Sequence, residues 1–485
     1  MRKKLILYGA GQRCRELYRI LKSLNAVDNL LIVDSNSDLE GSRFEGHYIR
    51  SADEIKNFCD SNLCITIADH AAIKAVRKKV MYEYGYDEES IIGFNQVILN
   101  AYTNSREILD VLNHMPVDNG GAVLFDCHNG LVLGGVESWS MDLCSALIMN
   151  GNNHIYIISD NGEYDVSRQL REHILMANID HQNCFSKSTV INLVEIIMNK
   201  MPCQVVTCAV NEVMLAAYLV KKRYPNMVRI IAVIHNSVEE VYEEYFDFKE
   251  CPDLYIGVSQ DIEKEMITRG IITQNNIYVM TCPFECEETV SREYSEDMSE
   301  PIRIGYAGRI EYSQKRMDLV LKFLELMADK QIHFVMEFAG DGLARSEMEK
   351  YIMQRKLDKN VRFLGRVEHS KIKYFWRKND VCINLSDFEG RSISIIEAMG
   401  NGAVPVVTAT SGVREDITDQ YNGYIVPLGD YRAVADRIEY LSQHREELRR
   451  MGERAHQAVY PKSHMEAHLK FWEGILGDEM EQQRS

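Results

Sequence analysis

The sequence predicts an α/β protein with more than one parallel sheet. Short apolar segments of strand length alternate with helical segments along nearly the whole chain, which is typical of parallel strands covered by helices. At 485 residues the chain is too long for one hydrophobic core, and the usual domain size suggests about three domains. Its 46% hydrophobic and 26% charged residues are ordinary for a globular protein.

Charge and hydropathy argue against several classes of protein. The net charge of −17 is opposite to the basic surface that binds nucleic acid. No apolar run reaches the roughly 18 residues of a membrane helix, and the first residues lead into a strand instead of a signal-peptide core. We therefore expect a cytoplasmic protein. Contact with the inner face of a membrane, through the basic cluster at 221–229, stays open.

Cysteines and metal-ligating side chains give no pattern for a metal site. The 12 cysteines are scattered, and several lie in apparent strands, as buried free thiols do. Cys282 and Cys286 have nearly a ligand spacing, but no second Cys or His pair completes a zinc site. We expect no metal and no required cofactor.

The chain begins with a strand–turn–helix–strand unit of the dinucleotide-binding type. The strand at 3–9 runs into Gly9 and Gly11, and the second strand ends at Asp34, which is placed to accept hydrogen bonds from a ribose. Cys14 stands where the third glycine of the motif is expected, which weakens the case for a cofactor.

We assign residues 1–105 to a small Rossmann-like domain. It resembles the domains at the start of sialic-acid-type acetyltransferases and on some surface-polysaccharide enzymes. Two alternatives stay open: a nucleotide binds at Gly9, Gly11 and Asp34, or the domain is a structural addition.

Residues 106–290 read as a second α/β domain. Its first strand, at 122–127, leads to Gly134 and Gly135, which taken alone predict only a turn. The strand at 229–234 delivers His235 at its carboxyl end, where ligands bind in open α/β sheets. Further strands are predicted at 154–159, 204–208, 255–258 and 277–280. We interpret the acidic run at 239–244 as a solvated face.

Residues 291–485 read as the third α/β domain. The polar segment at 291–300 is interpreted as a hinge. A strand at 303–307 leads to Arg309, with Lys315 six positions later, and the chain ends in a helix near 465–476. Other strands are predicted at 334–339, 360–364, 381–385 and 404–408.

The most informative stretch follows the strand at 381–385. Glu389 and Glu397 lie on either side of a predicted helix start, and Gly390 lets the loop approach a ligand closely. The free N–H groups of the helix start form an anion site, and Ser392 can cap the helix. Carboxylates accept two hydrogen bonds from a diol, as in a sugar or a ribose.

This stretch resembles the Glu-x7-Glu signature of family 4 glycosyltransferases, retaining enzymes of the GT-B fold that use nucleotide sugars. The resemblance covers residues 120–460 and implies two Rossmann-like domains facing a cleft, preceded here by the small domain, with a C-terminal helix that crosses back. It implies that Glu389 contacts the donor sugar, Glu397 the ribose, and His235 the sugar and phosphate. The donor-binding residues that it implies, beside Glu397, are Gly134, Gly135, Arg309, Lys315, Gly390, Arg391, Ser392 and Ile393.

The loop departs from the family pattern at Ser392, where many members have a second glycine or a proline. We expect Arg391 either to contact acceptor or phosphate or to face water. No Asp-x-Asp motif occurs, which favours neutralisation of the diphosphate by Arg309, Lys315 and the helix start over a metal ion.

The function that we expect is retaining, metal-independent transfer of a hexose-type sugar. The donor is a nucleotide sugar, for which a UDP-sugar is our first choice, and the acceptor is a glycan or lipid-linked surface polysaccharide bound by the 106–290 domain. Two alternatives remain: a nucleotide-sugar epimerase of the same fold, and a non-catalytic regulator that binds nucleotide sugars.

Overall fold

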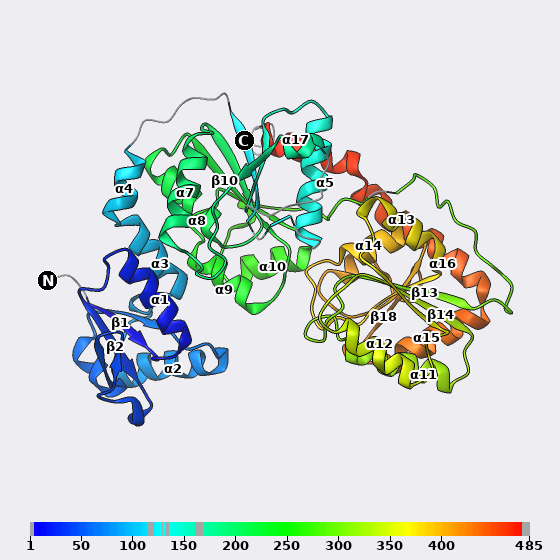
Figure 1. Cartoon of the computed structure of the whole chain (residues 1–485), viewed down its shortest axis with the longest axis horizontal. Coiled ribbons are helices and arrows are strands. Elements are labelled where there is room, and N and C mark those ends of the chain that lie inside the picture. Colours follow the sequence, from blue (N-terminus) through cyan, green and yellow to red (C-terminus); the bar gives the residue numbers. More distant parts are fainter. Residues whose placement is uncertain are drawn as a thin grey trace.

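The computed structural model describes residues 4–113, 121–128, 130–131, 135–160, 168–284 and 286–477. Three sheets organise this part of the chain, with helices on their faces (Figure 1). Nearly all strand pairs are parallel, as the long apolar strand segments predict. The predicted α/β class is therefore confirmed.

The N-terminal unit contains a five-stranded sheet in the order β3-β4-β2-β1-β5. Only the β3–β4 pair is antiparallel. Ile91 forms only a single bridge with Leu63, because a helix begins soon after it, at Phe94. The elements are β1 (Leu5–Tyr8), α1 (Gln12–Ser23), β2 (Leu30–Asp34), β3 (Arg43–Phe44), β4 (His47–Ser51), β5 (Asn62–Ile65), α2 (His70–Tyr84), α3 (Phe94–Thr103) and α4 (Arg106–Leu112).

The middle unit contains a seven-stranded sheet in the order β12-β11-β10-β9-β6-β7-β8. The first strand, β6, is buried along its whole length and lies between β9 and β7. The elements are β6 (Ala122–Cys127), α5 (Gly135–Met149), β7 (Ile155–Ser159), α6 (Arg168–Arg171), β8 (Ile174–Met176), α7 (Lys187–Met198), β9 (Cys203–Thr207), α8 (Glu212–Arg223), β10 (Val228–Ile234), α9 (Glu239–Asp247), β11 (Leu254–Gly257), α10 (Gln260–Thr268) and β12 (Ile277–Val279).

The C-terminal unit contains a six-stranded sheet in the order β15-β14-β13-β16-β17-β18. The elements are β13 (Ile302–Ala307), α11 (Met317–Asp329), β14 (Phe334–Ala339), α12 (Arg345–Gln354), β15 (Val361–Gly365), α13 (His369–Lys378), β16 (Val381–Asn384), α14 (Ile393–Gly400), β17 (Val404–Thr408), β18 (Tyr424–Val426), α15 (Tyr431–Gln443), α16 (Arg445–Ser463) and α17 (Met465–Leu476).

The last helix, α17, leaves the C-terminal unit and packs beside α5 of the middle unit (Figure 1). Trp472 of α17 is fully buried, and its ring centroid lies 5.8 Å from that of Trp139. Arg229 also donates a hydrogen bond to the carbonyl of Ile475 (2.9 Å). The hydrophobic core of the middle unit therefore includes the end of the described chain.

The segment at 291–300 is attached to the C-terminal unit. Arg292 forms a buried ion pair with Asp380 (2.6 Å), and the hydroxyl of Tyr294 donates to the carbonyl of Gly402 (2.7 Å). The hinge interpretation of this segment is therefore wrong. The two larger units are instead joined next to the bridge between Phe284 and His464.

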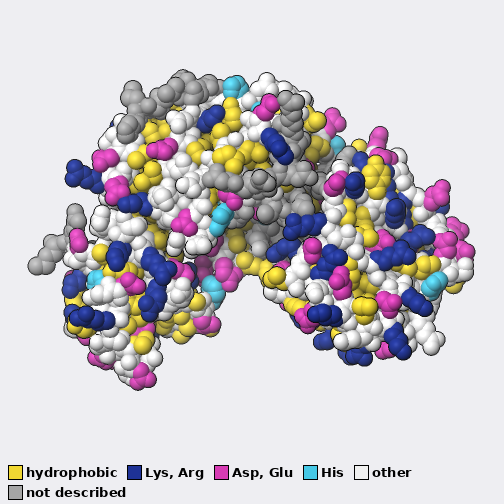
Figure 2. Space-filling view, in the orientation of Figure 1, with side chains coloured by type: hydrophobic (Ala, Val, Ile, Leu, Met, Phe, Trp, Pro, Cys, Tyr) yellow, Lys and Arg dark blue, Asp and Glu magenta, His cyan; other side chains and the backbone are white. Residues whose placement is uncertain are grey.

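The acidic helix α9 contacts the N-terminal unit along one side, so its interpretation as a solvated face holds only in part: the side chains of Glu239, Glu240 and Glu243 are 38%, 58% and 42% exposed. Asp247 accepts a hydrogen bond from the backbone N–H of Asn95 (3.1 Å), and His70 lies within 3.2 Å of Glu243. Figure 2 shows acidic and histidine side chains gathered where these two units meet. Among the helices described, none is both long and apolar enough to cross a membrane.

Candidate active site

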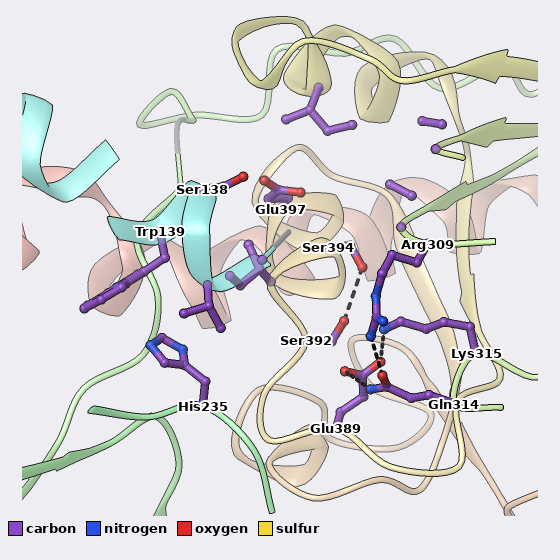
Figure 3. A pocket seen from close by; sticks show the side chains of 18 of the residues that line it. Ser138, Trp139, His235, Arg309, Gln314, Lys315, Glu389, Ser392, Ser394 and Glu397 are labelled. Atoms are coloured by element: carbon purple, nitrogen blue, oxygen red, sulfur yellow. Dashed lines mark hydrogen bonds and ion pairs between the residues drawn. The ribbon is translucent and has the colours of Figure 1, made fainter. Parts of the chain in front are cut away.

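A cavity of about 770 Å³ lies between the middle and C-terminal units. Its walls come from the carboxyl ends of strands in both sheets, where ligands bind in open α/β folds. Figure 3 shows His235 and Trp139 facing Arg309, Lys315 and Glu389 across this space. Its volume is in the range of small-molecule sites.

Glu389 lies in the loop after β16 and is held by several donors. Its Oε1 accepts from Lys315 Nζ (2.5 Å), from Ser386 Oγ (2.8 Å) and from Asn384 Nδ2 (3.3 Å). Only 10% of its side chain is exposed. The carboxylate is therefore fixed in the cavity wall beside a cation.

Gly390 lies where the loop after β16 packs directly against the middle unit. A Cβ at this position would lie 2.1 Å from the carbonyl oxygen of His235, so no other residue fits without moving the backbone. Next to it, Ser237 Oγ donates to the carbonyl of Glu389 (2.9 Å). The loop and the end of β10 thus meet at the cavity.

The helix α14 begins at Ile393, with Ser392 as its N-cap residue. The predicted side-chain cap is wrong, because Ser392 Oγ bonds to Ser394 Oγ (3.2 Å) and Asn384 Nδ2 (3.3 Å) and not to a helix N–H. Since Ser392, Ile393 and Ser394 all line the cavity, the first turn of α14 borders it. The positive end of the helix dipole is therefore available to an anion.

Arg309 and Lys315 supply positive charge from the turn after β13. Arg309 Nη2 donates to Gln314 Oε1 (2.7 Å), and its side chain is 59% exposed. Gln314 Nε2 donates to the carbonyl of Phe388 (2.9 Å) and approaches Glu389 Oε2 (3.4 Å). Gln314 is a cavity residue that sequence reasoning missed, because nothing in a single turn reveals its distant partners.

His235 follows β10 and packs edge-on against Trp139, with 4.8 Å between the ring centroids. Burial lowers the pKa of His235 to about 4, so the ring is neutral near pH 7. Its Nε2 is buried and has no hydrogen-bond partner among the described residues. A neutral imidazole at the cavity wall can donate or accept one hydrogen bond there.

The Arg391 side chain does not face the solvent. Its guanidinium forms paired hydrogen bonds with Asp416 (2.6 and 2.8 Å) and donates to the carbonyl of Val258 (3.1 Å). The side chain is 4% exposed. The expectation that Arg391 faces water is therefore wrong. Its guanidinium, for which a contact with the sugar acceptor or a phosphate was the other expectation, is bound to Asp416 instead.

The remaining predicted donor residues that the structure describes line the cavity. Glu397, in α14, is 6% exposed and lines the cavity near Ser138 (Figure 3). Gly135 starts α5, and a Cβ there would lie 3.5 Å from Ile393. Gly134 lies outside the described residues.

The predicted N-terminal nucleotide residues form a separate turn, which does not border the cavity. Asp34 Oδ2 accepts from the backbone N–H of Ala10 (2.7 Å), and its Oδ1 accepts from that of Asn36 (2.8 Å). Gly9 has φ of 105° and packs against Ile67, and Gly11 precedes α1. The carboxylate that was expected to bind a ribose is thus bonded to the turn itself.

A buried polar cluster behind α5 was also missed. Asp126, at the end of β6, accepts from Asn211 Nδ2 (2.6 Å) and lies 3.2 Å from His128 Nδ1. Burial opposes charge on the His128 ring, but Asp126 raises the pKa of His128 overall. These residues follow β6 and β9, where the strand order of the middle sheet reverses direction.

Metal-ligating side chains do not gather in the described ranges: no group of at least three His, Cys, Asp or Glu residues there is arranged to hold an ion.

Two family models match parts of the chain. Residues 288–458 match glycosyl transferases group 1, and residues 1–92 match the family described as C2185-like, N-terminal. The first of these matches contains Arg309, Lys315, Glu389 and Glu397.

Curated relatives are distant. N-acetyl-alpha-D-glucosaminyl L-malate synthase from Bacillus anthracis is 24% identical over 277 residues, which are 54% of this chain and 71% of the relative. Poly(ribitol-phosphate) alpha-N-acetylglucosaminyltransferase from Staphylococcus aureus (strain COL) is 26% identical over 170 residues, 35% of this chain. The chain spans only 34% of that second relative.

Solved structures share the fold at low identity. The apo form of the lipopolysaccharide outer core galactosyltransferase WaaB has a TM-score of 0.58 at 15% identity, over 74% of this chain and 99% of that one. Anabaena Alr3699/HepE in complex with UDP and glucose has a TM-score of 0.60 at 15% identity, over 75% and 100%. TarM matches over 98% of this chain and 99% of its own, with a TM-score of 0.51 at 12% identity.

These likenesses confirm the predicted GT-B fold, with an additional N-terminal unit, and the family match supports a glycosyltransferase.

Proposed function

We propose that the protein is a retaining, metal-independent glycosyltransferase that moves a hexose-type sugar from a nucleotide sugar to a glycan or lipid-linked acceptor. The observation that supports it most is that Glu389, Glu397, Arg309 and Lys315 border one cavity with the start of α14. These residues supply carboxylates for sugar hydroxyls and cations for a diphosphate. We place the acceptor on the middle unit, and we choose a UDP-sugar as the donor.

The leaving diphosphate is the group that needs most stabilisation. When the bond between the sugar and the β-phosphate breaks, negative charge grows on the phosphate oxygens, and prearranged cations and N–H groups lower the barrier. Arg309, Lys315 and the first turn of α14 are the proposed partners of these oxygens. No metal ion is needed in this arrangement.

The sugar and the ribose are assigned to the two carboxylates. Glu389 is oriented by Lys315 and Ser386, so it can accept from sugar hydroxyls without first reorganising. Glu397 is proposed to accept from the ribose. From the middle unit, neutral His235 would hydrogen-bond to the sugar or phosphate through Nε2, the atom that has no described protein partner.

Retention is proposed from the family resemblance, with attack of the acceptor hydroxyl on the same face from which the diphosphate leaves. The leaving phosphate itself then takes the proton of that hydroxyl. The relatives are named for N-acetylglucosamine transfer, and one fold neighbour holds UDP and glucose, which supports testing both kinds of sugar.

The donor is tested by incubating the protein with UDP-, GDP- and CMP-sugars without acceptor. Slow hydrolysis of one sugar nucleotide, with the released sugar keeping its anomeric configuration, is expected. Conversion of the donor into an epimer would favour the epimerase alternative, and binding without turnover would favour the regulator.

The role of Lys315 is tested by the K315A variant. Loss of a hydrogen bond between charged groups costs roughly 1.5–3 kcal/mol, so the affinity for the diphosphate should fall about tenfold to a hundredfold. Titration calorimetry should show this loss for UDP and a much smaller loss for the free sugar, because Lys315 also holds Glu389. K350A, which removes an exposed lysine from α12, serves as control. Equal losses for UDP and free sugar would contradict the assignment.

A further inference from the structure

We infer that Gln314 is a positioning residue that keeps the cation of Arg309 separate from the carboxylate of Glu389. The inference rests on the proposed function, in which the first group binds phosphate and the second binds sugar. Gln314 explains why these two opposite charges, which lie close together in one cavity, do not form an ion pair with each other.

Both ends of the Gln314 amide are engaged. Its Oε1 accepts from Arg309 Nη2 (2.7 Å), while its Nε2 donates to the carbonyl of Phe388 (2.9 Å) and lies 3.4 Å from Glu389 Oε2. Figure 3 shows Gln314 next to all three charged side chains of this corner. The amide therefore stands between the guanidinium and the carboxylate.

The backbone of Gln314 is anchored independently of Arg309. Its carbonyl accepts from the N–H of Asp387 (3.0 Å), in the same loop that carries Glu389. The position of the amide is thus set by the 387–389 loop. Arg309 in turn takes its position from the amide, because the guanidinium is largely exposed and its other described ionic partner, Glu311, is 3.6 Å away.

The neutrality of the amide matters for phosphate binding. An amide oxygen orients a guanidinium without cancelling its charge, whereas a carboxylate would form a stronger, charge-neutral pair with it. Glu389 already has one cation, since Lys315 Nζ lies 2.5 Å from its Oε1. If Arg309 also paired with Glu389, both would be less available to the donor. Gln314 prevents this by occupying the intervening position.

The Q314E variant tests the inference, because it keeps an acceptor for Arg309 but adds a negative charge next to Glu389. We expect the affinity for the preferred nucleoside diphosphate, chosen from UDP, GDP, ADP and CDP, to fall at least about tenfold, while that for the matching monophosphate changes less than about twofold. The comparison isolates the β-phosphate. General damage to the fold would weaken both ligands equally.

Two further variants sharpen the test. Q314A removes the spacer without adding charge, so we expect a smaller loss of diphosphate affinity than in Q314E but a clear fall in kcat, because Arg309 is no longer oriented. S313A is the matched control. Ser313 is in the same turn and bonds only to Glu311 (3.3 Å) among the contacts described for it, so the diphosphate affinity and kcat of S313A should stay unchanged.

The outcomes separate the inference from the proposed function. If Q314E binds the diphosphate as tightly as the wild-type protein does, or loses affinity equally for diphosphate and monophosphate, the role of Gln314 is overturned while the proposed function stands. If the wild-type protein binds no nucleoside diphosphate, the proposed function fails and the role of Gln314 fails with it.

Discussion

Arg316 has an unusual backbone conformation next to Lys315, in the turn after β13. Its φ of 51° and ψ of 50° are left-handed, which costs an L-residue roughly 1–2 kcal/mol. Its guanidinium forms paired contacts with Asp387 (2.9 Å each) and further hydrogen bonds with Asp318 (3.0 Å). The side chain therefore links the loop of Glu389 to the start of α11, at the expense of local strain.

The R316G variant should separate these two effects. Glycine relieves the left-handed strain, while the lost ion pairs are partly exposed and worth about 0.2–1 kcal/mol each. We expect the free energy of unfolding to change by less than about 1 kcal/mol, measured by urea denaturation. Turnover should nevertheless fall at least about fivefold, since the loop at 386–389 loses its anchor. A large loss of stability with unchanged kcat would contradict this account.

Among single residues, Arg391 and Ser392 show the limit of sequence reasoning at the site. Their positions next to Gly390 predict that they line the cavity, and they do. The direction of each side chain depends on a partner elsewhere: Asp416 binds the guanidinium of Arg391, and Asn384 binds Ser392 Oγ. A motif specifies which residues are present, but their orientation follows from contacts that the motif does not contain.

At the scale of elements, helix α9 links the N-terminal unit to the site. Its acidic face contacts His70, Lys74 and the start of α3, and a Cβ on Gly93 would collide with Asp247. The loop before α9 carries Ser237, which bonds to the backbone of Glu389. The acidic run resembled a solvated surface because its partners lie in another unit of the chain.

The interface of α9 should make stability depend on pH. Burial raises the pKa of Glu244 from 4.5 to about 7 and that of Asp247 from 3.8 to about 6, against the opposing effect of nearby Arg13. Between about pH 4 and pH 7 the folded state therefore binds more protons than the unfolded state. The contribution of these two groups to the free energy of unfolding is present at low pH and is lost as the pH rises through this range. Other charged groups on the interface are His70, Lys74, Glu239, Glu240 and Glu243.

Thermal unfolding of E244Q and D247N at pH 5 and pH 8 tests this dependence. Both variants should lose less stability than the wild-type protein between these two values, because the amide does not titrate. E250Q, at an exposed position beyond α9, should behave like the wild-type protein. Identical losses in all four proteins would show that the two carboxyl groups do not carry the effect.

At the scale of the molecule, the two larger units contact each other through reciprocal polar bonds beside the cavity. Glu415 of the C-terminal unit accepts from the N–H of Gln260 at the start of α10 (2.6 Å), and Asp261 accepts from the N–H of Gly412 (3.1 Å). Arg391 adds its bond to the carbonyl of Val258. These contacts hold the units together in the conformation that encloses the cavity.

The D261A variant should loosen this contact without leaving a buried charge. Asp261 is exposed, so the free energy of unfolding should change by less than about 1 kcal/mol. The KM for the sugar nucleotide should rise severalfold, because part of the energy of substrate binding is then used to bring the two units together. Small-angle scattering of the free variant should give a larger radius of gyration. K264A, on the same helix, is the control. An unchanged KM and radius would mean that Asp261 does not contribute to closure.

Much of the fold could be read from local pattern. The apolar segment predicted at 122–127 coincides with β6, and the one at 381–385 with β16 to within one residue. Strands buried on both faces must be apolar along their length, so each is visible in its own sequence. The placement of His235 and Glu389 at the cavity follows, because each comes after the carboxyl end of a strand in its own parallel sheet, where ligands bind.

The sequence alone was thus sufficient for most of the strands and for the groups that could bind a sugar diphosphate, and its family resemblance was sufficient for the GT-B class. Tertiary structure alone decided that Arg391 pairs with Asp416, that Asp34 accepts from Ala10 in the turn after β1, that α9 is an interface and that Gln314 separates two charges. The physical reason is the same in each case. Hydrophobic periodicity is a property of neighbouring residues, whereas the partner of a polar group is fixed only when distant segments are packed together.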